Sequence, residues 1–289
     1  MSINIKDLIQ FGKKELNNIS NTPLLDTRII VSHFLEKSET YLITHEEVEV
    51  SKELEDIIKK NIEKRKNHYP IAYITNKKEF YGRDFYIDKN VLIPRPETEE
   101  LIEYVLKIIK NDFDSNLIKI LDLGTGSGCI AITLKKELEQ QTRSRDLAYR
   151  EEISKINIYA SDISTKALGI AKRNAENHKV DIKFFQSDLL EKFPKKYFDL
   201  IIANLPYIED SWNHPSIKHE PNTALFSGKD GLDHYRRLSK QVSSENCENL
   251  ILEIGDNQVT EIKKIFSFTK DVKIIKDLGN INRIVHIKF

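Results

Sequence analysis

Apolar and polar residues alternate with a helical period over the first seventy positions. Apolar side chains recur every three or four residues within 5–16, 24–34 and 54–62, a spacing typical of helices with one buried face. Ser51 precedes the third of these segments and supplies half of a capping box. The pattern predicts a small helical domain over residues 1–69 with charged outer faces. Its role stays open between a structural cap and a domain that docks a substrate.

The pattern changes at Pro70. Residues 71–74 and 80–87 are rich in aromatic and β-branched side chains, and a polar segment at 75–79 separates them. Two such runs around a polar segment are typical of a β-hairpin. We therefore expect residues 70–90 to form a β-hairpin linker between the helical domain and the rest of the chain.

Strands and helices alternate through the remaining residues, 91–289. A loop that carries Pro94 and Pro96 leads into the first of these helices. The alternation predicts a doubly wound α/β domain with a mostly parallel sheet. No helical pattern separates the last two strands, so these should pair antiparallel. The strands are expected at 118–123, 156–162, 182–185, 198–203, 250–254, 272–275 and 284–287, and the helices among them at 127–138, 164–177, 232–242 and 257–266.

Residues 139–155 interrupt this alternation with eight charges among seventeen residues. A short loop would suffice between a helix and the next strand. We expect an extended or partly disordered surface insertion here. A basic docking loop is a weaker alternative, because the positive and negative charges nearly cancel.

The composition is that of a globular protein and narrows the possible functions. Hydrophobic residues make up 39% and charged residues 31% of the 289 positions, and 45 basic residues balance 45 acidic ones. A net charge of zero argues against a protein that binds nucleic acid over its whole surface, although a local basic patch stays open. The chain starts without the pattern of a secretory signal and has no apolar run long enough to cross a membrane. A cytoplasmic protein is therefore expected.

The sequence gives little support for disulfide bonds or for a metal-binding site. Two cysteines are too few for a disulfide scaffold or an all-cysteine zinc site. The eight histidines form neither an H-x-x-x-H nor an H-E-x-x-H pattern. We predict no bound metal.

The clearest chemical signal is the glycine-rich segment D-L-G-T-G-S-G at 122–128, which follows a predicted strand and opens a predicted helix. Glycines in this context let the backbone approach a nucleotide-like ligand. The dinucleotide fingerprint requires glycine where Cys129 stands, so a dehydrogenase of the usual type is disfavoured. A tight turn without a ligand stays open. The candidate binding residues are Gly124, Thr125, Gly126, Ser127 and Gly128.

Carboxylates after the next two strands would complete such a site. Asp162 lies 34 residues after Gly128, or 17 once the segment 139–155 is discounted, and a ribose-binding carboxylate is expected at about 20. Asp188 could accept a hydrogen bond from an adenine amino group, with Leu189 packed on the ring. A residue in the position of Asp188 is more often a turn or helix cap.

The fourth predicted strand ends in A-N-L-P-Y-I at 203–208, where open α/β sheets bind ligands. This turn suits the methylation of a planar nitrogen, whose lone pair is delocalised and whose two N–H groups need acceptors. The Asn204 side-chain oxygen and the Leu205 carbonyl can accept both, Pro206 stiffens the turn, and Tyr207 can pack on the planar group. An ordinary strand-ending turn is the alternative.

Together these motifs resemble the class I S-adenosylmethionine-dependent methyltransferases. More narrowly, the chain resembles the HemK/PrmC family, the N5-glutamine methyltransferases of peptide chain release factors. The resemblance covers nearly the whole chain, and the proline-rich loop combined with the Asn-x-Pro-Tyr turn is highly specific. The matching motifs are P-I-A-Y-I-T at 70–75, E-F-Y-G at 79–82, L-I-P-R-P-E-T-E at 92–99, D-L-G-T-G-S-G at 122–128, N-L-P-Y-I at 204–208, H-E-P-N-T-A-L at 219–225, G-K-D-G-L-D-H-Y-R at 228–236 and L-E-I-G at 252–255.

The resemblance implies a seven-stranded methyltransferase domain after a helical domain and a hairpin linker. It implies that residues 124–128, Asp162, Leu189 and Asn204 surround S-adenosylmethionine, and that residues 204–207 hold the glutamine of a release factor. Leu205 departs from the family, which usually has proline there. Leucine keeps the backbone carbonyl but lacks the ring that restricts φ, so rigidity is reduced more than chemistry.

Two other functions stay open. An amino methyltransferase that acts on adenine or guanine of DNA or RNA uses a similar turn, but it would need base flipping and a basic track. The zero net charge counts against it. A non-catalytic cofactor-binding module is the second alternative, and the intact glycine-rich segment and Asn204 turn count against that.

Overall fold

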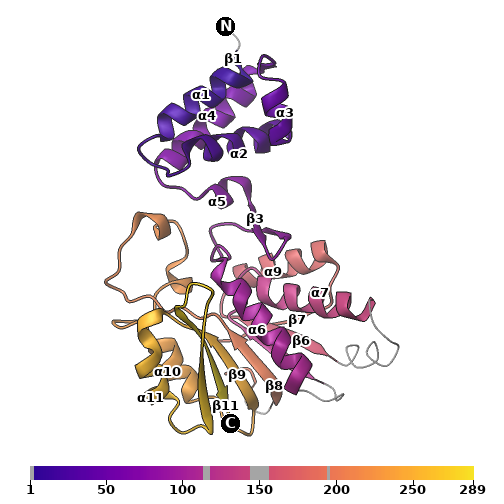
Figure 1. Cartoon of the computed structure of the whole chain (residues 1–289), viewed down its shortest axis with the longest axis vertical. Coiled ribbons are helices and arrows are strands. Elements are labelled where there is room, and N and C mark those ends of the chain that lie inside the picture. The colour runs from indigo at the N-terminus through magenta and orange to yellow at the C-terminus, as the bar shows by residue number, and fades with distance from the viewer. Residues whose placement is uncertain (1–2, 113–117, 144–155, 194–195) are drawn as a thin grey trace. The chain divides into compact units, whose positions relative to one another are not determined.

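The computed structural model describes residues 3–112, 118–143, 156–193 and 196–289 (Figure 1). Contacts within the chain divide it into two compact units. The first comprises Met1–Lys77 with Asn213–His219, and the second comprises Lys78–Trp212 with Glu220–Phe289. The division thus falls inside the expected linker 70–90, at Lys77, rather than at its two ends.

The first unit is helical, as its apolar pattern predicts. Its core contains the fully buried side chains of Leu8, Leu16, Ile30, Leu42 and Ile58. The side chains of Asn4, Ser38 and Ser51 cap three of its helices by accepting a hydrogen bond from a first-turn N–H group. Its elements are α1 (Ile5–Leu16), α2 (Pro23–Leu35), α3 (Glu39–Thr44), α4 (Lys52–Lys66), α5 (Ile71–Thr75) and the paired short strands β1 (Ile3–Asn4) and β2 (Glu49–Val50).

The predicted hairpin is wrong in its first strand. Residues 71–74 belong to helix α5, which starts after Pro70 and ends where Asn76 takes a left-handed conformation with φ 51°. Ile74 joins the core of the helical unit, so burial of one helical face outweighs the β-propensity of these residues. The second predicted strand, 80–87, is also wrong in its bounds, because a turn at residues 81–82 divides it. The hairpin that does form consists of β3 (Lys77–Phe80), most of which lies in the predicted polar segment, and β4 (Arg83–Tyr86).

The second unit contains a seven-stranded sheet with the order β10-β11-β9-β8-β5-β6-β7. β5 to β9 run parallel, whereas β11 is antiparallel to both β9 and β10. The expected doubly wound sheet and its antiparallel final pair are therefore confirmed. The strands are β5 (Lys119–Leu123), β6 (Asn157–Asp162), β7 (Lys183–Gln186), β8 (Phe198–Ala203), β9 (Cys247–Glu253), β10 (Asp271–Lys276) and β11 (Asn282–Lys288).

Two groups of helices flank this sheet (Figure 1). In one group α7 packs against both α6 and α9, and in the other α10 packs against α11. The strand order reverses at β5, with β6 on one side and β8 on the other, and a ligand is expected at such a switch point. The helices are α6 (Glu97–Asp112), α7 (Cys129–Arg143), α9 (Thr165–His178), α10 (Asp233–Ser239) and α11 (Val259–Ile265), with 3-10 turns η1 (Pro215–Ile217), η2 (Asn222–Ala224) and η3 (Asp256–Gln258).

The expected insertion 139–155 starts as a helix rather than as an extended segment. Helix α7 continues to Arg143, so its first five residues are helical, five positions past the predicted end at Leu138. The rest of the insertion, 144–155, lies outside the described residues. Within the described residues, no helix has the length and apolar character needed to cross a membrane, and no cluster of three or more histidine, cysteine, aspartate or glutamate side chains is arranged to hold a metal ion.

Candidate active site

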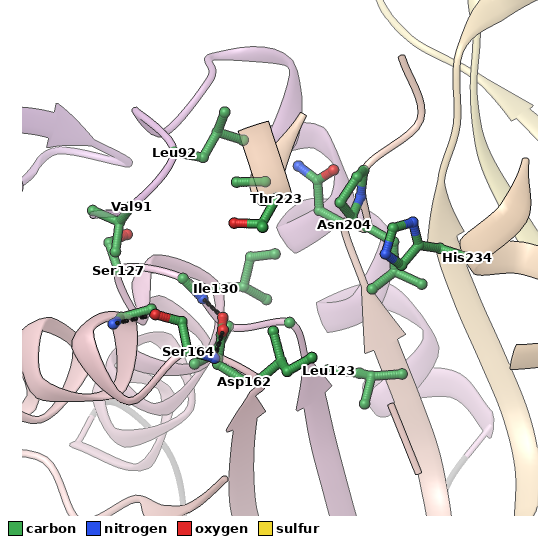
Figure 2. Close-up of a pocket in the computed structure, with 18 of the residues that line it drawn as sticks. Val91, Leu92, Leu123, Ser127, Ile130, Asp162, Ser164, Asn204, Thr223 and His234 are labelled. Carbon is green, nitrogen blue, oxygen red and sulfur yellow. Dashed lines mark hydrogen bonds between the residues drawn. The ribbon is translucent and has the colours of Figure 1, made fainter. Parts of the chain in front are cut away.

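A cavity lies at the carboxyl ends of β5, β6 and β8, within the second unit (Figure 2). Figure 2 shows Asp162 and Ser164 below it, Val91 and Leu92 above, and Asn204 with His234 at its right. Of the predicted site residues, Gly128 and Tyr207 do not line the cavity. The others do, namely Gly124, Thr125, Gly126, Ser127, Asp162, Asp188, Leu189, Asn204, Leu205 and Pro206.

Hydrogen bonds to the ends of β5 and β6 hold the glycine-rich loop in place. The backbone N–H groups of Gly124 and Thr125 both donate to the Ser161 carbonyl, at 2.8 and 2.9 Å. Asp122 accepts from the Thr125 hydroxyl at 2.6 Å and from the Ala131 N–H at 3.2 Å. Burial raises the pKa of Asp122 to about 7. These bonds fix the loop from beneath and leave its upper face to a ligand.

The glycines of the loop have different roles. A Cβ atom added at Gly126, where φ is 54°, would meet no atom within 4 Å, because this residue faces the cavity. A Cβ at Gly128 would lie 3.0 Å from Ile132 and 3.2 Å from Ala171. Gly126 thus permits close approach of a ligand, whereas Gly128 permits close packing of α7 and α9.

Asp162 connects the loop with the next strand. One carboxylate oxygen accepts from the Gly126 N–H at 2.9 Å, and the other accepts from the Ser164 N–H at 2.8 Å. Burial raises the pKa of this carboxyl. The carboxylate keeps acceptor capacity beyond these bonds, so the group can accept a hydroxyl donor from within the cavity. This arrangement fits the ribose of a nucleoside.

The third strand leads to an ion pair that the sequence does not suggest. Arg237 on α10 donates to Asp188 at 2.6 Å, and both side chains line the cavity. Asp188 would thus have to accept hydrogen bonds from both Arg237 and an adenine amino group. The Leu189 backbone takes a left-handed conformation with φ 46°, and the Ser187 hydroxyl donates to its carbonyl at 2.8 Å. The buried Leu189 side chain forms part of the cavity wall.

Asn204 is oriented by a residue far away in the sequence. Its Nδ2 donates to the Thr98 hydroxyl oxygen at 3.1 Å, and Thr98 is buried in the first turn of α6. Among the described residues the Asn204 Oδ1 has no partner, so it is left as an acceptor. Leu205 is buried, and a Cβ at Gly124 would lie 3.2 Å from its side chain. The leucine therefore packs on the glycine loop and supports the turn in place of a proline ring.

Tyr207 does not line the cavity, and its packing on the substrate amide stays a prediction. Its ring packs against the core of the sheet domain, and burial raises the pKa of its phenol to about 12. Its carbonyl accepts from the Gln258 side chain at 2.9 Å. A Cβ at Gly231 would lie 2.2 Å from that same carbonyl. Tyr207 therefore anchors the turn from behind.

Two further contacts near the cavity cannot be predicted from the sequence, although Arg95, Glu220 and His234 lie in motifs that match the family. Glu220 is buried and accepts from the Arg95 guanidinium at 2.5 Å and from the Ile93 N–H at 3.1 Å. This pair ties the proline-rich loop to residues 219–225. His234 lies 2.7 Å from the Ser227 hydroxyl through Nδ1, and burial lowers the pKa of its imidazole.

Known proteins place the chain in a family. Residues 7–75 match the family model of the PrmC N-terminal domain, and residues 103–221 match that of the methyltransferase small domain. The release factor glutamine methyltransferase of Bacillus cereus is 34% identical over 268 residues, which are 89% of this chain and 89% of that protein. The chain belongs to the release factor glutamine methyltransferase family. The resemblance stated from the motifs is thereby confirmed.

Longer relatives and a solved structure complete the comparison. The bifunctional methyltransferase of Rickettsia typhi is 35% identical over 99% of this chain, but the chain spans only 58% of that relative. The catalytic domain of hMettl16, in complex with a MAT2A 3′UTR hairpin, superposes with a TM-score of 0.52 at 16% identity, covering 71% of this chain and 75% of that one. This likeness concerns the fold alone and agrees with the methyltransferase fold expected for the second unit.

Proposed function

We propose that this member of the release factor glutamine methyltransferase family methylates the side-chain amide nitrogen of the glutamine in the Gly-Gly-Gln motif of peptide chain release factors. The observation that carries the proposal is the hydrogen bond from Asn204 to Thr98. Because the Asn204 Nδ2 is used in this bond, the Asn204 Oδ1 is left at the cavity as an acceptor. The N–H groups of a primary amide can donate to such an acceptor.

The cofactor that suits the cavity is S-adenosylmethionine, which supplies the methyl group. The open space before Gly126 and the remaining acceptor capacity of Asp162 support this choice. Asp162 would hold the ribose hydroxyls, and Asp188 with Leu189 would hold the adenine. Residues 124–127 would lie along the remainder of the molecule.

The substrate amide would bind at the Asn204 turn. Its two N–H groups would donate to the Asn204 Oδ1 and the Leu205 carbonyl, which orients the nitrogen toward the methyl group and favours the positive charge that develops on it. The nitrogen would gain the methyl group as the bond between that group and the cofactor sulfur breaks, and it would give up one proton to water. An adenine or guanine amino group would also match this turn, but family membership and the zero net charge favour the protein substrate.

The helical residues 1–69 suit a docking role in this function. A single flexible loop gives too little contact to align the glutamine, so further binding energy must come from elsewhere on the release factor. If these residues dock the substrate, kcat/KM should be much higher for intact release factor than for a short Gly-Gly-Gln peptide. Equal values would remove the docking role. The proposed function would place the enzyme in the cytoplasm, without a metal and without a stable nucleic-acid partner.

Transfer of a radiolabelled methyl group tests the proposal directly. Purified release factor, DNA and RNA are offered in separate reactions with the labelled cofactor. We expect label in the release factor alone, and none when Asn204→Ala replaces the wild type. Label in DNA or RNA would support the amino methyltransferase instead. Cofactor binding without transfer to any of the three would support the non-catalytic module.

A further inference from the structure

A buried carboxyl group lies behind the Asn204 turn. Glu253 ends β9, and only 1% of its surface is exposed. Its Oε2 is buried and has no hydrogen-bond partner within the described residues. An ionisable group without full pairing is costly to bury. Such a group calls for a functional explanation.

The surroundings of Glu253 join it to the turn. The neighbouring groups are the hydroxyls of Thr98 and Tyr207 and the charged side chains of Arg283 and Glu97. Burial raises the pKa of Glu253 to about 7, and the Thr98 hydroxyl and Arg283 partly offset this rise. Other titratable groups also face it. Tyr235 donates its hydroxyl to the Glu253 carbonyl at 2.7 Å, the charge of Glu253 adds to the effect of burial in raising the pKa of Cys129, and Arg283 also donates to Asp277 at 3.2 Å.

Thr98 has a single hydroxyl proton. The acceptor of this proton determines which way the side-chain amide of Asn204 is oriented. The Thr98 oxygen accepts from the Asn204 Nδ2, so its proton points away from that contact and is available to another acceptor. An ionised carboxylate can only accept hydrogen bonds. A carboxylate near Thr98 would therefore attract this proton and favour the observed orientation of the Asn204 amide.

We propose that Glu253 is a positioning residue, which acts through Thr98 to hold the Asn204 Oδ1 toward the substrate amide. The proposal rests on the function argued above. If the carboxylate is lost or protonated, Thr98 is free to donate to the Asn204 Oδ1. Asn204 would then turn its NH₂ group toward the NH₂ group of the substrate, and two donors would face each other.

The ionised form of Glu253 is the active one in this scheme. Because its pKa is raised to about 7, kcat should rise with pH and level off above neutrality. On the acid side it should fall by up to about tenfold per pH unit. In Glu253→Gln the amide oxygen accepts from Thr98 at every pH, so this rise should disappear while kcat at pH 8 stays within a few-fold of wild type.

Methylation kinetics with release factor as substrate test the positioning role. At Glu253 and at Thr98, a disruptive substitution is compared with a conservative one. Glu253→Leu and Thr98→Val should lower kcat at pH 8 at least tenfold with little change in the KM for S-adenosylmethionine. Glu253→Gln and Thr98→Ser should retain activity. Asn249→Ser is the matched control, because Asn249 is also a buried polar residue of β9 but bonds to Asp199 and His286. It should keep the pH profile of wild type. A Glu253→Gln profile with the wild-type rise would overturn the proposal.

A second readout needs no substrate. The Nδ2 proton signals of Asn204, assigned by their loss in Asn204→Ala, should exchange slowly in wild type and Glu253→Gln. They should exchange at least tenfold faster in Thr98→Val and Glu253→Leu. Unchanged exchange in both of the latter would refute the positioning role. If wild type shows this exchange pattern but methylates no release factor, the function fails while the hydrogen-bond chain stands. If Glu253→Leu does not fold, the two variants Thr98→Val and Glu253→Gln decide the matter.

Discussion

The two sides of the cavity are built in different ways. The glycine loop is held by its own strand and by the end of the next one, with Asp122 bonded to Thr125 three positions away and Asp162 bonded to Gly126 36 positions before it. The Asn204 turn is held by distant residues, with Thr98 106 positions before Asn204 and Gln258 51 positions after Tyr207. The loop is thus determined by two adjacent strands, β5 and β6. The turn is a product of the whole fold, and its geometry depends on elements at both ends of the sheet domain.

This difference has a functional consequence. A loop that binds a common cofactor can be the same in many enzymes, whereas the substrate side must be tuned to one reacting group. Substitutions in the loop should therefore change cofactor affinity. Substitutions around the turn should change the rate of transfer at saturating cofactor. The predictions below test that separation.

Asn204→Ala should have the largest effect. Loss of one preorganised acceptor at a reacting group costs about 10²–10³ in rate, while the glycine loop and Asp162 remain intact. Cofactor affinity from calorimetry should change little. A mutant with near-wild-type turnover would remove Asn204 from the chemistry.

Asp162→Ala tests the other side of the cavity. A hydrogen bond to a charged group contributes about 1.5–3 kcal/mol, so the dissociation constant of S-adenosylmethionine should rise roughly ten- to a hundredfold. At saturating cofactor kcat should be largely kept. Calorimetry that finds an unchanged dissociation constant would contradict the ribose assignment.

Gly231→Ala should disturb the turn without touching the cavity. Its new Cβ would lie 2.2 Å from the Tyr207 carbonyl oxygen, so the turn must shift. We expect kcat to fall about tenfold, because a small misalignment of reacting groups has an effect of this size. Gly82→Ala is the matched control. Gly82 has a similar φ of 69° but no atom within 4 Å of its added Cβ. The control should be destabilised by about 1 kcal/mol through backbone strain alone and keep its kcat.

Glu253→Gln should change activity least and stability in a pH-dependent way. The folded protein holds the Glu253 proton more tightly than the unfolded chain, since the pKa is raised from 4.5 to about 7. Stability from this group is present below pH 4.5 and is lost as pH rises toward 7. Glutamine cannot ionise, so the mutant should gain on the order of 1–3 kcal/mol over wild type at pH 8 and much less at pH 5. Denaturant unfolding at both pH values checks this, and an equal gain at both would contradict it.

Sequence patterns predict those parts of the molecule that local rules determine. The order of strands and helices follows from alternation, and the glycine loop and Asp162 follow from spacing. The prediction of the first hairpin strand is wrong because Ile74 can satisfy either a strand or a helix, and only the packing of α5 on the helical core decides between them.

Long-range contacts account for the rest. No pattern in the chain indicates that Thr98 meets Asn204, that Arg237 pairs with Asp188 or that the Tyr207 carbonyl accepts from Gln258. The hydrogen bonds that hold these residues join positions 49 to 106 apart in the sequence. The motifs that contain them are visible, but a motif shows which residues matter without showing which atoms meet.

Tandem mass spectrometry can locate the methyl group that the enzyme transfers to the release factor. Release factor is incubated with the enzyme and S-adenosylmethionine and digested, and the peptide with the Gly-Gly-Gln motif is fragmented. The account predicts one added methyl group on the side-chain amide of that glutamine, and none in a release factor whose motif glutamine is replaced by alanine. A methyl group on another residue, or undiminished methylation of the altered release factor, would contradict it.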